Sequence, residues 1–321
     1  MTAYRLLAMG RVGVDLYPLQ HGVPLEAVQT FEKYLGGSPA NVAIAAARHG
    51  QRCALVSATG ADALGRYVHT ELLRLGVDDA FVSTISGGPP TSVTFYEVFA
   101  PDRFPLWPYR YPTAPDLLLD PELIPREAIR DADALWITGT GFSQEPSRSA
   151  HAAALAARGR KPHTILDLDF RPEGWPSAQA AREQLAPALE RVTVVVGSPA
   201  ECEVAVGERD PHRAASALLE RGAELAVVKR GPDGVLGATR DERVEAAAFP
   251  VTVLNALGAG DGFGGALVHG LLSGWDLART IHFANVAGAI VASRLGCSTA
   301  MPTTVEVERL LEDVGVLDDL A

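Results

Sequence analysis

Residues 255–263 read Asn-Ala-Leu-Gly-Ala-Gly-Asp-Gly-Phe, and their types and spacing suit the binding of an anion. The stretch follows a short apolar run at 251–254, so we predict a strand that turns through glycines into a helix near Gly260. The first turn of a helix leaves backbone N–H groups unpaired and carries a partial positive charge. Because Gly258 and Gly260 have no Cβ, a phosphate can approach the backbone there.

A carboxylate within this stretch, Asp261, is out of place in a loop that only binds phosphate. At about 4 Å two such anions repel each other by about 1 kcal/mol even in bulk water. Beside a transferring phosphoryl group, however, a carboxylate can take the proton from the attacking hydroxyl. Two other interpretations stay open on these residues alone. Gly260, Gly262 and Gly265 fit a dinucleotide motif, although the acid expected about twenty positions further on is missing, and Asp261 also suits a plain helix start.

Other polar residues follow predicted strands. Asp15 comes just after a strand at 6–9, and residues 36–41 open a helix for which we predict Ser38 as the N-cap. Three later strands are followed by polar segments at 167–171, 197–201 and 229–234. In an open α/β sheet, ligands bind outside the carboxyl ends of the strands, so we predict a cleft there that includes Asp261. The alternative for Asp15 is that its carboxylate binds no ligand and only accepts a hydrogen bond within a turn.

The elements that must position these residues alternate regularly, above all after residue 134. We predict strands at 6–9, 53–57, 134–137, 164–168, 192–196 and 225–228, and helices at 38–49, 62–75, 148–159, 178–189, 212–221, 260–272 and 277–294. Strands and helices that alternate at this spacing form a parallel sheet with right-handed crossovers. The fold class is therefore α/β.

Residues 82–111 depart from this pattern, because they combine two strand candidates with many prolines and aromatic residues. They predict a small accessory sheet, half of whose apolar face must be covered by substrate or by a partner subunit. Phe95, Phe99, Trp107 and Tyr111 exceed what so small a sheet can cover, so we predict a homodimer through this sheet.

Composition excludes several classes of protein. The 321 residues are 47% hydrophobic and carry a net charge of -11, which argues against a nucleic-acid partner and confines any anionic ligand to a local basic pocket. The three cysteines are too far apart in sequence to indicate a disulfide framework or a cysteine-rich metal site. No uncharged apolar span reaches the roughly eighteen residues of a membrane helix, and no signal peptide is evident. We expect a cytoplasmic protein without a membrane partner.

Three of these segments together resemble a known family. Residues 36–50 and 255–263 are similar to its two signatures, and residues 229–234 to the nucleotide loop, of the ribokinase-like, phosphofructokinase-B sugar kinases. The resemblance covers essentially the whole chain. It implies one ribokinase-like domain over residues 1–321, a doubly wound, mostly parallel sheet flanked by helices, and a small β-sheet lid at about 12–35 and 82–111. It also implies ATP and Mg²⁺ as cofactors.

The resemblance also implies roles for individual residues. Asp261 is the catalytic base beside an anion hole formed by Gly258, Ala259 and Gly260. The residues that contact the sugar are Asp15, Gly36, Gly37 and Asn41. Those on the nucleotide side are Ser198, Glu201, Lys229, Gly231, Gly234 and Asn285, with Glu201 acting on magnesium through water and Asn285 near the adenine. Ser198 departs from the family, which usually has asparagine there.

One departure from the family pattern points to a subfamily. Most members have Asp-Thr where this chain has Asn255-Ala256. In this pair and in residues 33–41 and 166–172, the chain resembles the 5-dehydro-2-deoxygluconate kinases of inositol breakdown. The same departure makes a monovalent-cation site doubtful. Arg110 lies in a segment similar to the carboxylate-binding lid of 2-keto-3-deoxygluconate kinases, and arginine is the natural partner of a carboxylate, as is Arg171.

The expected activity is therefore transfer of the γ-phosphoryl group of ATP to the terminal hydroxyl of an acidic sugar, foremost 5-dehydro-2-deoxygluconate. The alternatives are a 2-keto-3-deoxygluconate kinase and a kinase of ribokinase or fructokinase type. Two alternatives come from other classes of protein. An NAD-binding oxidoreductase would bind NAD, and a non-catalytic sugar sensor would bind its ligand without consuming ATP.

Overall fold

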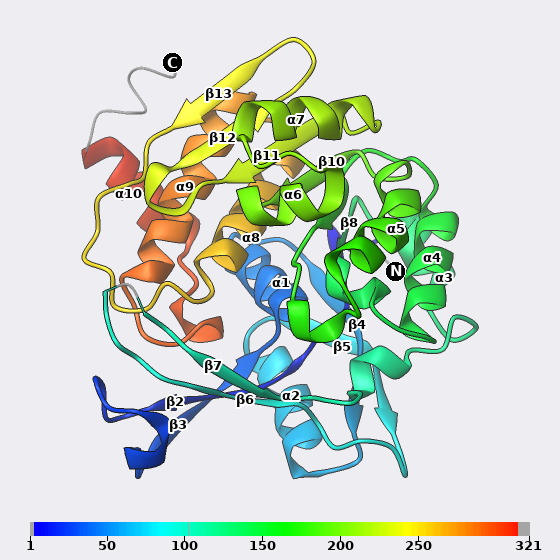
Figure 1. The fold of residues 1–321 in the computed structure, drawn as a ribbon, viewed down its shortest axis with the longest axis vertical. Helices are drawn as coiled ribbons and strands as arrows, with labels where there is room; N and C mark the ends of the chain where they lie inside the picture. The colour runs from blue at the N-terminus through cyan, green and yellow to red at the C-terminus, as the bar shows by residue number, and fades with distance from the viewer. Residues whose placement is uncertain (1–2, 102, 314–321) are drawn as a thin grey trace.

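The computed structural model describes residues 3–101 and 103–313, and its framework is a large twisted sheet flanked by helices on both faces (Figure 1). Among the described residues this sheet has nine strands, in the order β13-β12-β11-β10-β9-β8-β1-β4-β5. Their bounds are β1 (Leu6–Met9), β4 (Cys53–Gly60), β5 (Val77–Ile85), β8 (Ala134–Thr138), β9 (Thr164–Asp167), β10 (Val194–Gly197), β11 (Leu225–Lys229), β12 (Val235–Ala238) and β13 (Arg243–Ala246). The seven strands from β11 to β5 are parallel, and β12 and β13 form an antiparallel edge.

The central strands read as continuous apolar runs because helices bury both faces of the sheet. Successive residues of β1 enter different cores: Leu6 and Ala8 face one, and Leu7 and Met9 the other. The helices are α1 (Ser38–Arg48), α2 (Ala63–Arg74), α3 (Arg126–Asp131), α4 (Ser147–Arg158), α5 (Ala178–Leu189), α6 (Pro199–Val206), α7 (Pro211–Glu220), α8 (Ala259–Leu272), α9 (Leu277–Ala292) and α10 (Thr304–Asp313). Buried residues of α1, α2, α8, α9 and α10 join the first core and those of α3 to α7 the second. The predicted α/β doubly wound fold is confirmed.

Small residues let α8 pack closely on its neighbours. A Cβ added at Gly265 would lie 2.3 Å from the Cβ of Ala45 in α1, and one at Gly262 would lie 2.6 Å from Val291 in α9. The glycine-rich sequence of α8 therefore brings the start of this helix against the start of α1.

A second sheet of four strands lies beside the large one, at the lower left in Figure 1. Its order is β3-β2-β6-β7, with bounds β2 (Gly13–Pro18), β3 (Phe31–Gly36), β6 (Val93–Tyr96) and β7 (Leu106–Tyr109). We call this sheet the lid. The residues expected in it at 82–85 belong instead to β5, which pairs with β4 at the edge of the large sheet.

Most predicted elements agree with the structure to within a few residues. The strand at 6–9 and the helix at 178–189 have the observed bounds, whereas the strand expected at 192–196 begins at Val194. The antiparallel edge formed by β12 and β13 was not predicted. Within residues 3–101 and 103–313, none of the helices is long and apolar enough to cross a membrane.

Candidate active site

The turn that precedes α8 is held by buried hydrogen bonds rather than by a strand. The expected strand at 251–254 is wrong: this segment is irregular, and the N–H groups of Leu254 and Asn255 both donate to the carbonyl of Ala292 at the end of α9. The Asn255 side chain is completely buried, and its Oδ1 accepts from the N–H of Leu257 at 3.1 Å. Its Nδ2 donates to Tyr17 Oη at 3.3 Å, which ties the turn to the lid.

The N-terminus of α8 is open toward a ligand. Gly258 is its N-cap at φ +83, a conformation that favours glycine, and a Cβ there would lie 2.9 Å from Cys297 Sγ. A Cβ on Gly260 would meet only Lys229 Nζ, at 3.5 Å. Within the described part of the chain, the N–H groups of Gly258 and Gly260 donate to no protein acceptor. These donors and the helix dipole suit an anion.

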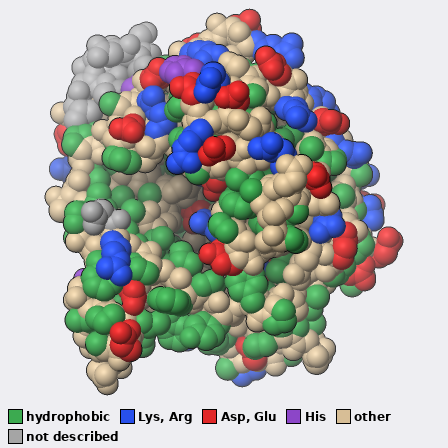
Figure 2. Space-filling view, in the orientation of Figure 1, with side chains coloured by type: hydrophobic (Ala, Val, Ile, Leu, Met, Phe, Trp, Pro, Cys, Tyr) green, Lys and Arg blue, Asp and Glu red, His purple; other side chains and the backbone are tan. Residues whose placement is uncertain are grey.

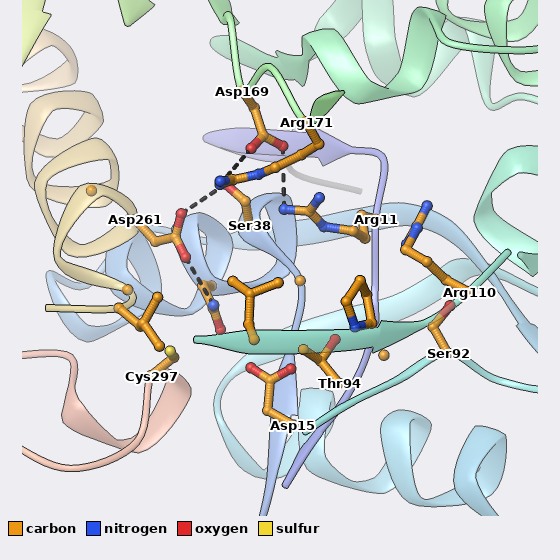
Figure 3. Close-up of a pocket in the computed structure, with 18 of the residues that line it drawn as sticks. Arg11, Asp15, Ser38, Ser92, Thr94, Arg110, Asp169, Arg171, Asp261 and Cys297 are labelled. Atoms are coloured by element: carbon orange, nitrogen blue, oxygen red, sulfur yellow. Dashed lines mark hydrogen bonds and ion pairs between the residues drawn. The ribbon is translucent and has the colours of Figure 1, made fainter. Parts of the chain in front are cut away.

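Asp261 lies in the first turn of α8 and is held by two side chains of α1 (Figure 3). Ser38 Oγ donates to its Oδ1 at 2.7 Å, and Asn41 Nδ2 donates to its Oδ2 at 2.9 Å. Burial raises the pKa of this carboxyl, and the two hydrogen bonds oppose that shift. A carboxylate held in this way keeps its orientation while it accepts a proton.

Ser38 does not have the capping role that the sequence predicts. The N-cap of α1 is Gly37, at φ +104, and a Cβ on it would lie 2.4 Å from the carbonyl oxygen of Arg11. Ser38 is the first helical residue instead, so its hydroxyl is free to reach Asp261.

A cavity of about 280 Å³ extends from Asp261 to the lid. Figure 2 shows the molecule hollowed on this face, with acidic and basic side chains inside the hollow. The predicted site residues that line the cavity are Asp15, Gly37, Asn41, Arg110, Arg171, Glu201, Lys229, Gly258, Gly260 and Asp261. The structure thus brings together ten predicted residues from segments that are widely separated in sequence.

The other predicted site residues do not line this cavity: Gly36, Ala259, Ser198, Gly231, Gly234 and Asn285. Gly36 has a supporting place, because a Cβ there would lie 2.2 Å from the carboxyl of Asp15. Ser198 is the N-cap of α6 in a capping box with Glu201. The side chain of Asn285 donates to the carbonyl of Ala247 at 2.7 Å. The nucleotide roles of these residues remain predictions.

An ion pair between a partly buried lysine and a buried aspartate faces the N-terminus of α8. Lys229 Nζ lies 3.2 Å from Asp167 Oδ2. Burial raises the pKa of Asp167 to about 7, against the effect of Lys229. Burial disfavours the charged form of Lys229, but Asp167 and Glu201 outweigh it and raise the pKa of the ammonium. The lysine is therefore a fixed positive charge beside Gly260.

Three arginines line the cavity, and each is paired with a buried aspartate. Arg11 and Arg171 lie 3.2 and 2.9 Å from the two oxygens of Asp169, and Arg110 lies 2.9 Å from Asp116. Burial opposes ionisation of Asp169, but Arg11 and Arg171 outweigh it and lower its pKa. The Arg110 side chain is only 9% exposed, so its charge is largely withdrawn from solvent.

Sequence reasoning missed several residues of this cavity. Arg11 follows β1 by two residues, and its place at a strand end could have identified it. Asp167 and Asp169, at and just after the end of β9, stood in a segment that the sequence marked as polar, but they were assigned no role. Ser92 and Cys297 carried no local signal, since they reach the cavity only through the pairing of distant segments.

Comparison with known proteins agrees with this geometry. The model of the pfkB family carbohydrate kinases matches residues 4–304. The chain belongs to this family of carbohydrate kinases. It is 33% identical over 314 residues to 5-dehydro-2-deoxygluconokinase of Geobacillus thermodenitrificans, covering 96% of this chain and 93% of the relative. The protein of the same name from Bacillus subtilis is 31% identical over 314 residues, with 97% and 96% covered.

A solved structure shows the same fold. The fructokinase with bound ATP from Xylella fastidiosa superposes with a TM-score of 0.84 at 24% identity, over 97% of this chain and 98% of that one. The family assignment makes this kinase an enzyme of phosphoryl transfer to sugars, and the nicotinamide oxidoreductase is set aside.

Proposed function

We propose that this kinase transfers the γ-phosphoryl group of ATP to the terminal hydroxyl of 5-dehydro-2-deoxygluconate, an acidic sugar. The names of the relatives support the substrate, and the three arginines of the cavity support its acidity. Asp15 and Asn41 line the cavity as donors and acceptors for sugar hydroxyls.

The observation that carries the proposal is the placement of Asp261. Its carboxylate faces the cavity at the N-terminus of α8, with Ser38 and Asn41 fixing both oxygens. A sugar hydroxyl beside it would lose its proton to Asp261 as its oxygen attacks the γ-phosphorus, while the bond from that phosphorus to the bridging oxygen breaks and ADP leaves. The free N–H groups of Gly258 and Gly260 stabilise the charge on the transferring group without reorganising.

The nucleotide side has residues that fit magnesium and phosphate. In the part of the chain that the structure describes, no cluster of three metal-ligating side chains occurs. Magnesium bound with a nucleotide needs only one or two carboxylates, with phosphates and water completing its shell. Glu201 lines the cavity and would hold the ion through water, and Lys229 would pair with a phosphate oxygen. Bound magnesium neutralises charge on the phosphates.

Monovalent-cation activation should be weak. Asn255 has an uncharged amide, and its Nδ2 donates to the carbonyl of Gly296 at 3.4 Å, so this carbonyl already has a partner. Hard cations favour carboxylate and free carbonyl oxygens. We expect exchange of sodium for potassium to change the rate by less than about twofold, and a several-fold rise in steady-state rate would contradict this.

A substrate panel tests the proposal. ADP release is measured with 5-dehydro-2-deoxygluconate, 2-keto-3-deoxygluconate, fructose and ribose, at saturating ATP and magnesium. The proposal expects kcat/KM to be highest for the first acid. A higher value for 2-keto-3-deoxygluconate would reassign the substrate, and equal turnover of fructose would refute an acidic sugar. Sugar binding without ADP release would indicate a sensor.

A further inference from the structure

A small third core joins the lid to the turn that precedes α8. Its buried members are Tyr17, Tyr96, Val98 and Cys297, and Leu257 of the turn packs against them. Tyr17 and Tyr96 belong to the lid strands β2 and β6, and their rings stack with centroids 4.4 Å apart. The lid is therefore packed directly against the segments that shape the anion-binding turn.

Tyr17 lies behind the wall of the cavity. Asp15 and Tyr17 are two positions apart on β2, so their side chains project from the same face of the strand. Asp15 and Tyr96 line the cavity, whereas Tyr17 does not and is only 3% exposed. Tyr17 thus touches no ligand in the cavity, and any effect that it has on the reaction must pass through another residue.

The Tyr17 hydroxyl holds the amide of Asn255. Asn255 Nδ2 donates to Tyr17 Oη at 3.3 Å, and the same hydroxyl lies 2.9 Å from Cys297 Sγ. Burial raises the pKa of the Tyr17 hydroxyl and of the Cys297 thiol well above their usual ranges, so both groups stay protonated. Because Oη accepts from the amide, its own proton is free to point toward the sulfur.

Asn255 carries this restraint into the turn. Its Oδ1 accepts from the N–H of Leu257 at 3.1 Å, two residues further along the chain. Gly258 follows directly, and a Cβ added to it would lie 2.9 Å from Cys297 Sγ, so the thiol supports the turn on that side. Figure 3 shows Cys297 below Asp261, at the same side of the cavity. The direction of the free N–H groups of Gly258 and Gly260 therefore depends on an amide that the lid holds.

The bond from Asn255 to Tyr17 has no substitute. Within residues 3–101 and 103–313, no other hydrogen bond joins the strands of the lid to residues 251–258. A donor stabilises a transition state most when it is already oriented as the charge develops. Loss of this bond should therefore weaken transition-state stabilisation while leaving the binding of both substrates nearly unchanged.

We propose that Tyr17 is a positioning residue for phosphoryl transfer, whose hydroxyl orients the anion-binding turn through the amide of Asn255. The lid strand that brings Asp15 to the cavity thereby also orients the donors for the transferring group. This inference rests on the proposed function, because that function assigns charge stabilisation to Gly258 and Gly260. It does not depend on which sugar is the substrate.

Steady-state kinetics of Tyr17→Phe test this role, with the sugar that the wild type turns over fastest. The variant keeps the ring contacts and loses only the hydroxyl. We expect kcat to fall about three- to tenfold, the loss typical of one hydrogen bond, and KM for sugar and for ATP to stay within about twofold. Tyr34→Phe is the matched control, because its ring lies edge-on to Tyr17 at 5.5 Å and its hydroxyl interacts with Glu32. Its kcat should stay within about 1.5-fold of the wild type.

Asn255→Ser breaks the same bond from its other end. Serine still offers an oxygen to the N–H of Leu257, but it is too short to reach Tyr17. It should reproduce the loss in kcat, and adding Tyr17→Phe to it should cost less than about twofold more, because the two residues act as one unit. Losses that simply multiply would overturn the inference. If Tyr17→Phe does not fold, Asn255→Ser decides the question by the same split between kcat and KM.

A transition-state analogue distinguishes positioning from a structural role. ADP with aluminium fluoride imitates the transferring group, and its affinity for Tyr17→Phe should fall by the same factor as kcat. The affinity for ATP should change by less than about twofold. A merely structural role would lower the melting temperature and leave both the analogue affinity and the kcat of the folded enzyme unchanged, and that result would overturn the inference.

Gly260→Ala separates this inference from the proposed function. If Gly260→Ala leaves kcat unchanged, the turn does not stabilise the transferring group, and the proposed function fails together with the inference. If Gly260→Ala lowers kcat but Tyr17→Phe and Asn255→Ser keep it within about 1.5-fold, only the positioning role is wrong. A loss of kcat in all three variants, with KM nearly unchanged in Tyr17→Phe and Asn255→Ser, supports both.

Discussion

The turn at the start of α8 and the inner face of the lid enclose the same cavity but differ in how completely their polar side chains are paired. At the turn, Asn255 is fully buried with both ends of its amide hydrogen-bonded, and both oxygens of Asp261 accept hydrogen bonds. In the lid, Ser92 and Arg110 each keep a buried donor without a partner. Paired groups are preorganised for a fixed reaction step, whereas unpaired groups await a ligand. The difference supports chemistry at the turn and substrate choice at the lid.

The two regions also differ in packing, which is tight behind the turn and open on the outer face of the lid. The helix behind the turn is in such close contact with α1 that Gly265 has no room for a methyl group. The outer face of the lid leaves Trp107 and Tyr109 exposed. Substitutions at the turn should therefore affect turnover or folding, whereas those in the lid, Tyr17 apart, should affect KM or assembly.

The largest effect should come from Asp261→Asn, which keeps the shape of the side chain but cannot take a proton. We expect kcat to fall by about 10²- to 10⁴-fold with KM nearly unchanged. Measurement at saturating sugar and ATP decides the matter. If more than a tenth of the wild-type kcat remains, the base is elsewhere, and the chemistry cannot be assigned to the turn at the start of α8.

Gly260→Ala should be next in size. Its Cβ has open space in the protein, with Lys229 Nζ 3.5 Å away as the nearest atom, but it would intrude where the phosphate binds. We expect kcat to fall by about 10²- to 10³-fold, the loss associated with one oxyanion donor, with the melting temperature unchanged.

Gly265→Ala is the matched control on the same helix. Its Cβ would lie 2.3 Å from that of Ala45, so it should lower the melting temperature. The reverse outcome, a destabilised Gly260→Ala with normal turnover, would show that the turn is only structural.

The lid should also join two subunits, as the exposed aromatic residues indicate. Trp107→Glu places a charge in the proposed homodimer interface and should raise the dissociation constant about ten- to a hundredfold, in the range of a hot-spot residue. Leu123→Glu, at an exposed leucine outside the lid, should leave it unchanged. If light scattering finds the wild type only as a monomer at micromolar concentration, the lid does not join two subunits.

The smallest effect concerns Asp15, on the lid strand β2. Burial raises the pKa of this carboxyl to about 7, from 3.8 for an ordinary aspartate. Between these values the folded protein binds more protons than the unfolded chain, so stability falls as pH rises from 4 to 7. Asp15→Asn removes this contribution. Between pH 5 and 8, the melting temperature of the variant should therefore fall by a few degrees less than that of the wild type. Parallel melting profiles for the two proteins would contradict the assignment.

The sequence predicts elements well where one period dominates and less well where distant contacts decide. The buried strands and α5 followed from apolar patterning. The run at 251–254 was also expected to be a strand, but it is irregular, and the N–H groups of Leu254 and Asn255 pair with the carbonyl of Ala292 at the end of α9 instead. Ser38 has the composition of an N-cap, yet Gly37 takes that place and the hydroxyl serves Asp261, 223 residues away. Arg110 was expected from its segment, whereas its ion pair with Asp116 and the place of Ser92 at the same cavity follow only from the structure.

The network around Asn255 also bears on the order in which the chain folds. The Asn255 amide donates to Tyr17, which is 238 residues earlier in the chain. The Tyr17 hydroxyl in turn lies 2.9 Å from Cys297 Sγ, 280 residues after Tyr17. Closing such long loops is entropically costly and slow, so contacts of this separation form late. During synthesis the lid strands and α1 emerge long before α8. A chain that is still growing thus lacks its base and its anion turn, and it becomes competent to consume ATP only after its two ends have met.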